Sequence, residues 1–513
     1  MPNYKGIKEM SSSSKNNQAA TIFKNFSFLA LGKIIGNAFT FVLFVVLSRV
    51  YGQEGIGEYS FAMAYTGFFL VAADFGLYNL SIKEMSRNDG DISSYFNNIL
   101  ATRLLISSAI LLLLVLSILI LPFSDASKPV IACLGVYQII YTLTEGFTAL
   151  FVSQQRMHMA ALVEFTFRFC VAVLSSAVAL CGGKLLFRGE LLFGDEYLFG
   201  GEFLLGNELV YVVALFPIIA VIQLLFVYRY TVKEFNINVL SVSPKLFKQI
   251  LVTAMPYALF ALLRQLSTRI DVLLLGVLMG TAAAGIYNAS YRIVFLLLFL
   301  PYFVGVAVFP IASKLYANNQ QELISLYQVA LNLMVLIAIP VTLGLWIISP
   351  DLILLIYGGE FTESIFILQL LSLLLGLAFI QSIPRTLLTS CDMQMQITKS
   401  QWTCAWLNVL GNIALIPFYG VVGAAISTVF SEFVLTFVMI MKLRPLLGIP
   451  DMRLRFLISM LGSSTMISST LLYPDLYFVL FIPLSIVIYI LMLLGFKTIR
   501  ENEFSMLRKV LNK

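Results

Sequence analysis

Long apolar runs alternate with short polar segments along the whole chain. A helix needs about 20 residues to cross the hydrocarbon core of a bilayer, and most of the runs have about that length. Six runs precede a basic segment near residue 240, at 26–48, 59–81, 101–123, 129–151, 161–181 and 209–228. Eight follow it, at 251–278, 286–310, 327–348, 364–384, 402–418, 422–442, 454–472 and 477–497. The pattern predicts an all-α integral membrane protein with about 14 transmembrane helices.

Lys and Arg residues gather on alternate connecting segments. In membrane proteins the cytoplasmic segments carry this positive excess. With the N-terminus inside, most of the basic residues fall on the cytoplasmic side, including the clusters Lys83/Arg87, Arg229/Lys233/Lys245/Lys248 and Lys442/Arg444/Arg453/Arg455. The segment 351–363, predicted to be external, is acidic and has no base. Both termini are therefore predicted to be cytoplasmic, and the net charge of +6 is expected to face anionic lipid headgroups rather than nucleic acid.

One predicted external loop has an unusual sequence. Residues 185–208 read LLFRGE, LLFGDE, YLFGGE and FLLGNE, four variants of one six-residue unit. Two interpretations stay open. The loop is either an external flap or strand ladder over a cavity, or an expanded tract without a role, which is the simpler reading.

The composition excludes several classes of function. Apolar residues make up 59% and charged residues 12% of the 513 positions, far from the values of a soluble domain. The single histidine, His158, stands beside Arg156 at a predicted helix end, and the chain has no GxxxxGK[ST], CxxC or HExxH motif. The protein is therefore not expected to be an enzyme or to need a metal or cofactor. The odd number of cysteines, without paired spacing, predicts no disulfide framework.

Charged residues inside the predicted spans are the informative ones, because each costs at least about 2.5 kcal/mol near the bilayer centre. In the seventh span, Arg264, Thr268 and Asp271 are spaced i, i+4 and i+7, which predicts one common face. Arg269 points about 140° away from Arg264 around the helix. Arg292 follows in the eighth span. One carboxylate cannot neutralise three arginines, so a binding role for these arginines is weighed against interhelical pairing or snorkelling toward an interface.

The first half contains further charges within its spans. They are Lys33, Asp74, Glu145, and Glu164 with Arg168 one turn later. The spacing of Glu164 and Arg168 predicts an ion pair within one helix, which is mainly structural. Glu145, and Glu432 in the twelfth span, are equally good partners for the arginines.

An excess of cationic groups would attract an anionic ligand. Arginine suits phosphate because its planar guanidinium donates two hydrogen bonds at once. The candidate substrate-binding residues are Arg264, Arg269, Arg292, Lys33 and Arg168. The candidate residues for a coupling ion, H⁺ or Na⁺, are the acidic residues Asp74 and Asp271.

The two halves share a short pattern. Gly52, Gly57 and Tyr59 follow the first span, and glycines and a tyrosine recur 228 residues later at 280, 285 and 287. Equivalent placement after the first helix of each half favours a duplicated six-helix unit, as in many transporters. Pro256 lies about two turns before Arg264 and is a candidate bending point.

Four segments carry a resemblance to a known family. They are SRVYGQEGIGEYSFA at 48–62, DFGLYNLSIKEMSR at 74–87, RIDVLLLGVLMGTAAAGIYNASYRI at 269–293 and NIALIPFYGVVGAAISTVFSE at 412–432. As a set, they resemble the polysaccharide flippases, the oligosaccharide-transporter branch of the superfamily that also contains multidrug and toxin exporters (MATE) and lipid II flippases.

The resemblance implies a MATE-like plan of two six-helix lobes plus two C-terminal helices. On this plan the chain has a cytoplasmic tail (1–25), an N-lobe (26–228, with the external repeat loop at 182–208), a cytoplasmic linker (229–250), a C-lobe (251–442), two further spans (454–497) and a cytoplasmic tail (498–513). The implied function is translocation of a lipid-linked oligosaccharide across the cell membrane by a monomer, with the arginines receiving its phosphate. The repeat at 185–208 departs from the family.

Two rival functions stay open. A multidrug exporter of the same superfamily would need acidic residues to prevail in its cavity, whereas the spans here lean basic. A membrane glycosyltransferase or polymerase would normally need a large external loop with a base or an arginine cluster. The longest external loop offers only Lys184 and Arg188.

Overall fold

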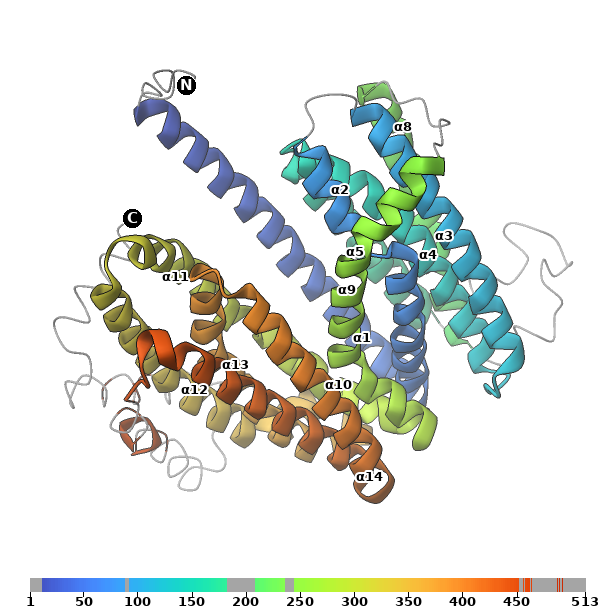
Figure 1. Cartoon of the computed structure of the whole chain (residues 1–513). Helices are drawn as coiled ribbons and strands as arrows, with labels where there is room; N and C mark the ends of the chain where they lie inside the picture. The colour runs from blue at the N-terminus through green and yellow to red at the C-terminus, as the bar shows by residue number, and fades with distance from the viewer. Residues whose placement is uncertain are drawn as a thin grey trace, which may run out of the picture. The chain divides into compact units, whose positions relative to one another are not determined.

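The computed structural model describes residues 12–87, 92–181, 208–235 and 244–451, with isolated positions between 455 and 491 (Figure 1). Within these ranges every regular element is helical. The chain divides into two compact units, Met1–Val50 with Ala62–Leu262, and Tyr51–Phe61 with Leu263–Lys513.

The first unit contains the helices of the first half of the chain. They are α1 (Ser12–Asp74) outside residues 51–61, α2 (Leu77–Met85), α3 (Ile92–Ile120), α4 (Ser127–Ser153), α5 (Met157–Leu180), α8 (Leu209–Phe235) and the first part of α9 (Pro244–Leu278). Helix α4 is central and packs against α2, α3, α5 and α8.

The second unit contains the rest of α9 and the helices that follow. They are α10 (Thr281–Leu297), α11 (Phe299–Asn318), α12 (Gln320–Ile356), a short 3-10 helix η1 (Gly359–Phe361), α13 (Glu363–Ser390) and α14 (Gln394–Leu447). Helix α13 is central here and packs against α10, α11, α12 and α14. Helices α4 and α13 coincide with the fourth and tenth predicted spans, so each half of the chain contributes its fourth span as a core helix.

Ten helical segments of the described residues are long and apolar enough to cross a membrane. Two of them, Ile34–Met85 and Gln394–Leu447, continue across a glycine with non-helical backbone, Gly52 and Gly420 respectively, and each contains two of the predicted spans. The ten segments therefore hold the first twelve predicted spans. The last two, at 454–472 and 477–497, fall almost wholly outside the described residues.

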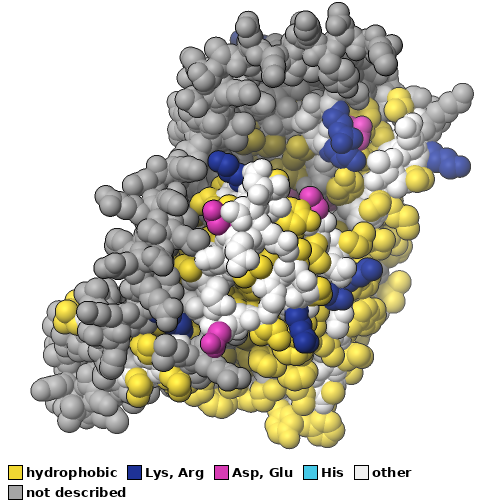
Figure 2. Space-filling view, turned by 60° about the vertical axis from the view of Figure 1, so that its left-hand side comes forward, with side chains coloured by type: hydrophobic (Ala, Val, Ile, Leu, Met, Phe, Trp, Pro, Cys, Tyr) yellow, Lys and Arg dark blue, Asp and Glu magenta, His cyan; other side chains and the backbone are white. Residues whose placement is uncertain are grey.

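The surface of both units is oily. Figure 2 shows hydrophobic side chains spread widely over the described surface, with Lys, Arg, Asp and Glu as isolated side chains. Ile120 and Leu180 of the first unit are 77% and 69% exposed, and Leu410 and Phe418 of the second unit are 58% and 83% exposed. Contiguous exposed apolar area on this scale is typical of a surface that contacts lipid. The protein is a multi-pass membrane protein.

The two copies of the glycine pattern have similar backbone conformations. Gly52 has φ 63° and ψ −163°, and Gly280 has φ 93° and ψ 170°, a backbone conformation that favours glycine. Gly57 and Gly285 lie against each other. A Cβ added to either glycine would lie 3.1 Å from the backbone of the other. Asn288 Nδ2 donates to Ser60 Oγ at 2.6 Å, a contact between residues that are also 228 positions apart.

Helices extend beyond the apolar runs. Residues 229–235 and 244–250 of the predicted linker are the last turns of α8 and the first turns of α9, and α1 begins at Ser12. Polar residues can continue a helix beyond the membrane into water. Apolar runs alone therefore predict helices that are too short at their ends. The repeat at 185–207 and the terminal tails 1–11 and 498–513 lie outside the described residues.

Candidate functional site

A buried carboxylate lies at the centre of a polar cluster in the second unit. Asp271, in α9, is 2% exposed. Its Oδ2 accepts hydrogen bonds from the Tyr287 hydroxyl and from Thr428 Oγ1, both at 2.9 Å, and its Oδ1 accepts one from Asn412 Nδ2 at 2.5 Å. All of these donors are neutral, and within the described residues no Lys or Arg lies within 4.0 Å of the carboxylate.

Further polar groups of α14 hold these donors in place. Asn412 Nδ2 also donates to the Asn408 backbone carbonyl at 2.9 Å, and Asn408 Nδ2 donates to Thr428 Oγ1 at 3.4 Å. A buried carboxylate is stable when a proton or a cation compensates its charge. Carboxylate, amide, hydroxyl and carbonyl oxygens suit small hard cations. In the part of the chain that the structure describes, no three or more His, Cys, Asp or Glu residues gather as a metal centre would require.

Arg264, Thr268 and Asp271 lie on the continuous helix α9 at the expected spacing, but they differ in burial. Arg264 and Thr268 are exposed, and the Thr268 hydroxyl donates to the Arg264 carbonyl at 2.9 Å. Asp271 is buried instead, because Tyr287 of α10 and two residues of α14 enclose it. Equal angular position along a helix does not give equal burial when the neighbouring helices cover only one end of the face.

Two of the predicted arginines lie on consecutive helices of the second unit, Arg269 in α9 and Arg292 in α10. Each of the two arginines is half-buried. No carboxylate of the described residues lies within 4.0 Å of the Arg264 or Arg269 guanidinium. The second unit thus contains all three predicted arginines, of which Arg264 is exposed and the other two are half-buried.

The predicted pairing of Glu164 and Arg168 is confirmed in the first unit. Arg168 Nη2 lies 2.7 Å from Glu164 Oε1, and its Nη1 donates to Asn37 Oδ1 at 2.5 Å. Arg168 packs across Gly36 of α1, where a Cβ would lie 2.6 Å from Arg168 Cδ. The side chain of Lys33 lies outside the described residues.

Asp74, the other candidate for a coupling ion, has a cationic partner that the sequence reading missed. Arg103 Nη2, in α3, lies 2.8 Å from Asp74 Oδ1, and the Arg103 side chain is fully buried. The Asp74 carboxylate also accepts hydrogen bonds from the backbone N–H groups of Gly76 at 3.1 Å and Tyr78 at 3.2 Å, so it caps the start of α2. Arg103 stands at the start of the predicted run 101–123 and was not among the charged residues singled out there, whereas α3 begins at Ile92 and places it well inside the helix.

Glu432 also differs from its expected role. Its Oε2 accepts a hydrogen bond from Gln381 Nε2 at 3.0 Å, and Cys404 Sγ lies 3.9 Å from its Oε1. In the described residues no arginine lies within 4.0 Å of Glu432, so it is not the ion-pair partner that was expected. Arg385 contacts Gln381 instead, and was missed because it stands one residue beyond the predicted run 364–384.

The sequence has relatives that are described as probable flippases. The probable low-salt glycan biosynthesis flippase Agl15 of Haloferax volcanii is 26% identical over 165 residues, which are 31% of this chain and 34% of that protein. The probable flippase AglR of the same organism is 26% identical over 166 residues, 32% of this chain and 35% of that protein. The matches thus span about a third of the length of these relatives.

Solved structures share the fold over most of the chain. The lipid II flippase MurJ in an inward closed conformation matches with a TM-score of 0.71 at 14% identity, over 94% of this chain and 99% of that one. An inward-facing MATE-family multidrug resistance transporter matches with a TM-score of 0.55 at 14% identity, over 86% of this chain and 98% of that one. The chain has the MurJ/MATE-like fold.

The family match covers more than half of the sequence. The model of the family described as polysaccharide biosynthesis protein matches residues 22–316. This range includes both halves of the duplicated glycine pattern, Asp271 and all three arginines of the second unit. The chain belongs to the polysaccharide biosynthesis protein family.

Proposed function

We propose that the protein is a flippase for a lipid-linked oligosaccharide. Its cargo is a glycan on polyprenyl phosphate or pyrophosphate, carried across the cell membrane by alternating access for cell-surface polysaccharide or glycoconjugate synthesis. Family membership, the MurJ-like fold and the flippase names of two relatives support this proposal. We further propose that it acts as a monomer with both termini in the cytoplasm.

The observation that carries the proposal is the set of arginines in the second unit. Arg264 and Arg269 have no carboxylate of the described residues within 4.0 Å, and Arg292 lies in the next helix, α10, of the same unit. Such cations need an anionic partner in a membrane, and the phosphate of the lipid carrier supplies one. We leave Arg168 out of this phosphate site because Glu164 and Asn37 already hold its guanidinium.

Asp271 is the proposed site of the coupling ion. Its carboxylate is buried among neutral oxygen and amide groups, which fits either a proton or Na⁺. Asp74 is the weaker candidate, because the Arg103 guanidinium already neutralises it. Binding at Asp271 would make translocation depend on an ion gradient.

A reconstituted transport assay tests the proposal. Purified full-length protein in proteoliposomes is given a fluorescent polyprenyl-pyrophosphate oligosaccharide, and its arrival in the opposite leaflet is followed with and without H⁺ and Na⁺ gradients. We expect translocation above that of empty liposomes. Arg269→Gln should weaken substrate binding about tenfold or more, the effect of losing a charge-assisted hydrogen bond. The control Arg444→Gln, at an exposed position near the end of α14, should leave it unchanged.

Variants at the acidic residue separate coupling from binding. Asp271→Asn should retain binding of the oligosaccharide but lose the gradient dependence of its transport. Translocation that is equal in wild type, Arg264→Gln and Arg269→Gln would contradict the phosphate site.

The rival functions give different results in the same vesicles. Efflux of cationic dyes without glycan translocation would favour the multidrug exporter, whose family shares the fold. Glycosyl transfer by the purified protein would favour the glycosyltransferase or polymerase. The solved structures reported above are a flippase and a transporter, and neither is described as an enzyme.

A further inference from the structure

Polar contacts between the two halves of α14 form successive rungs. Asn408 Nδ2 lies 3.4 Å from Thr428 Oγ1, and Cys404 Sγ lies 3.9 Å from Glu432 Oε1. We call each of these contacts a rung. Cys404 lies four residues before Asn408, and Glu432 lies four residues after Thr428. The two rungs are therefore one helical turn apart, about 5.4 Å. Thr428 also bonds Asp271. Glu432 therefore occupies the rung next to the proposed coupling site.

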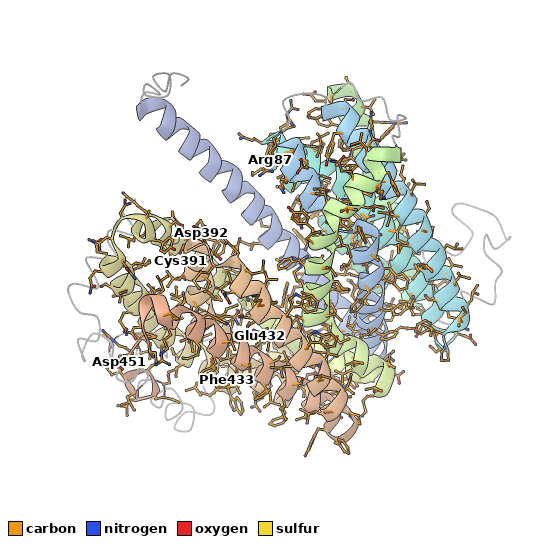
Figure 3. All side chains as sticks on the ribbon, viewed as in Figure 1. Arg87, Cys391, Asp392, Glu432, Phe433 and Asp451 are labelled. Atoms are coloured by element: carbon orange, nitrogen blue, oxygen red, sulfur yellow. The ribbon has the colours of Figure 1, made fainter. Side chains whose placement is uncertain are left out.

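The row of polar groups continues along α13. Gln381 Nε2 donates to Glu432 Oε2 at 3.0 Å, and Gln381 Oε1 accepts a hydrogen bond from Arg385 Nη2 at 2.9 Å. Arg385 Nη2 also lies 3.5 Å from Gln401 Oε1. The row ends six residues before the turn at 391–393, which Figure 3 shows at the end of α13, with Glu432 among the helices of the second unit. This turn is on the side predicted to be cytoplasmic.

The two ends of the row differ in exposure. Asn408 and Cys404 are each 2% exposed and Gln381 is 7% exposed, whereas Glu432 is half-buried and Arg385 is exposed. If these groups only held the helices together, a glutamine in place of Glu432 would serve as well. Its amide oxygen could accept the same hydrogen bond from Gln381, without the free-energy cost of a charge in the membrane. The negative charge of Glu432 is therefore the feature that needs a function.

We propose that Glu432 is a second station for the coupling cation, between Asp271 and the end of α13. The proposal rests on the proposed coupling site at Asp271. A cation that leaves Asp271 passes Thr428, which contacts Asp271, and meets the Glu432 carboxylate one turn farther along α14. The hydroxyl and amide groups of the Asn408–Thr428 rung supply oxygen ligands on the way.

Arg385 is a positioning residue for this station. By donating to Gln381 Oε1, it turns the amide N–H of Gln381, and not the amide oxygen, toward Glu432. When Arg385 moves away, Gln381 can rotate its amide and offer that oxygen to a cation. The Arg385 guanidinium thus repels cations at the exposed end of the row. It also keeps the Gln381 amide oxygen from binding them.

Cys404 provides a reporter beside Glu432. We suggest full-length protein in which Cys133, Cys170, Cys181 and Cys391 are replaced by Ser, reconstituted in lipid vesicles. The sample is treated with a cationic reagent, methanethiosulfonate ethylammonium, or an anionic one, methanethiosulfonate ethylsulfonate. Labelling is followed by intact-protein mass spectrometry, with Cys404→Ser as the blank. Each rate is divided by the rate of the reagent with a free thiol in solution.

The expected result is a cation-selective route. After normalisation, the cationic reagent should label Cys404 about tenfold faster than the anionic one, because a carboxylate at close range attracts it. Glu432→Gln should remove this preference. Arg385→Gln, at an exposed position where folding is not at risk, should raise the cationic rate severalfold. Monodisperse elution on size-exclusion chromatography shows that each variant is folded.

Two results would overturn the proposal. In the first, Cys404 reacts with neither reagent in the folded protein but with both after denaturation, which leaves Glu432 as a sealed helix contact. In the second, the normalised rates are equal and do not change in Glu432→Gln or Arg385→Gln. The glycan translocation assay on the same vesicles is independent of these rates, so failure of the flippase function is distinguishable from failure of the cation route.

Discussion

At the scale of single residues, the two units stabilise intramembrane carboxylates in opposite ways. Asp74 is neutralised by the fully buried Arg103, whereas Asp271 accepts hydrogen bonds from neutral side chains alone. The charge of Asp74 is thus compensated by a protein side chain. The charge of Asp271 is not, so that a mobile ion can compensate it. This difference is why we assign coupling to Asp271.

The ion pair of the first unit predicts a large effect on stability. Arg103→Leu leaves the Asp74 carboxylate without its cation, and losing one partner of a buried pair costs roughly 3 kcal/mol or more. We expect a clear drop in the thermal unfolding midpoint of the purified protein. Adding Asp74→Asn to Arg103→Leu should recover part of the loss, because the uncompensated charge disappears. A double variant as unstable as the sum of both single variants would show that the pair is not coupled.

At the scale of helices, the close approach of Gly57 and Gly285 organises the start of α10. A Cβ at Gly57 would collide with the Thr281 carbonyl oxygen, and one at Gly285 with the Gln53 carbonyl oxygen. Both contacts are with backbone, which cannot move aside cheaply. These positions therefore require glycine for helix contact, while Gly52 and Gly280 require it for their backbone angles.

We expect Gly285→Ala to destabilise the second unit by about 1–3 kcal/mol, the usual cost of overpacking. Gly359→Ala is the matched control, because a Cβ there would meet nothing within 4 Å and its φ is not positive. Thermal unfolding followed by light scattering compares the two variants. Equal midpoints would mean that α10 shifts freely, contrary to the packing described.

Helix α9 passes from one unit to the other. The boundary between Leu262 and Leu263 lies six residues after Pro256, within an unbroken helix. The bending role of Pro256 stays a prediction, since the structure describes one conformation.

At the scale of the whole molecule, the alternation of basic segments predicts the topology. With about 14 spans and the N-terminus inside, a green fluorescent protein fused to the C-terminus should fluoresce in a bacterial host, and an alkaline phosphatase fusion should be inactive. The opposite pair of results would mean an odd number of spans. Fusions after Leu447, at the end of α14, provide the matched control for the described part of the chain.

The sequence by itself determined the medium and the element type. Runs of about 20 apolar residues leave a helix in lipid as the stable solution, because backbone groups there must bond within the segment. For this reason the first twelve spans agree with the helices. The pairing of Glu164 with Arg168 was also predictable, since it depends on one helical turn.

Only the tertiary structure decided which charges meet. Arg103 with Asp74, Asn412 and Thr428 with Asp271, and Gln381 with Glu432 join residues 29 to 157 positions apart. Hydropathy gives the length of a helix but neither its rotation nor its neighbours. Burial and partners therefore follow from helix packing, which places Asp271 inside and Arg264 outside although the two share a helical face.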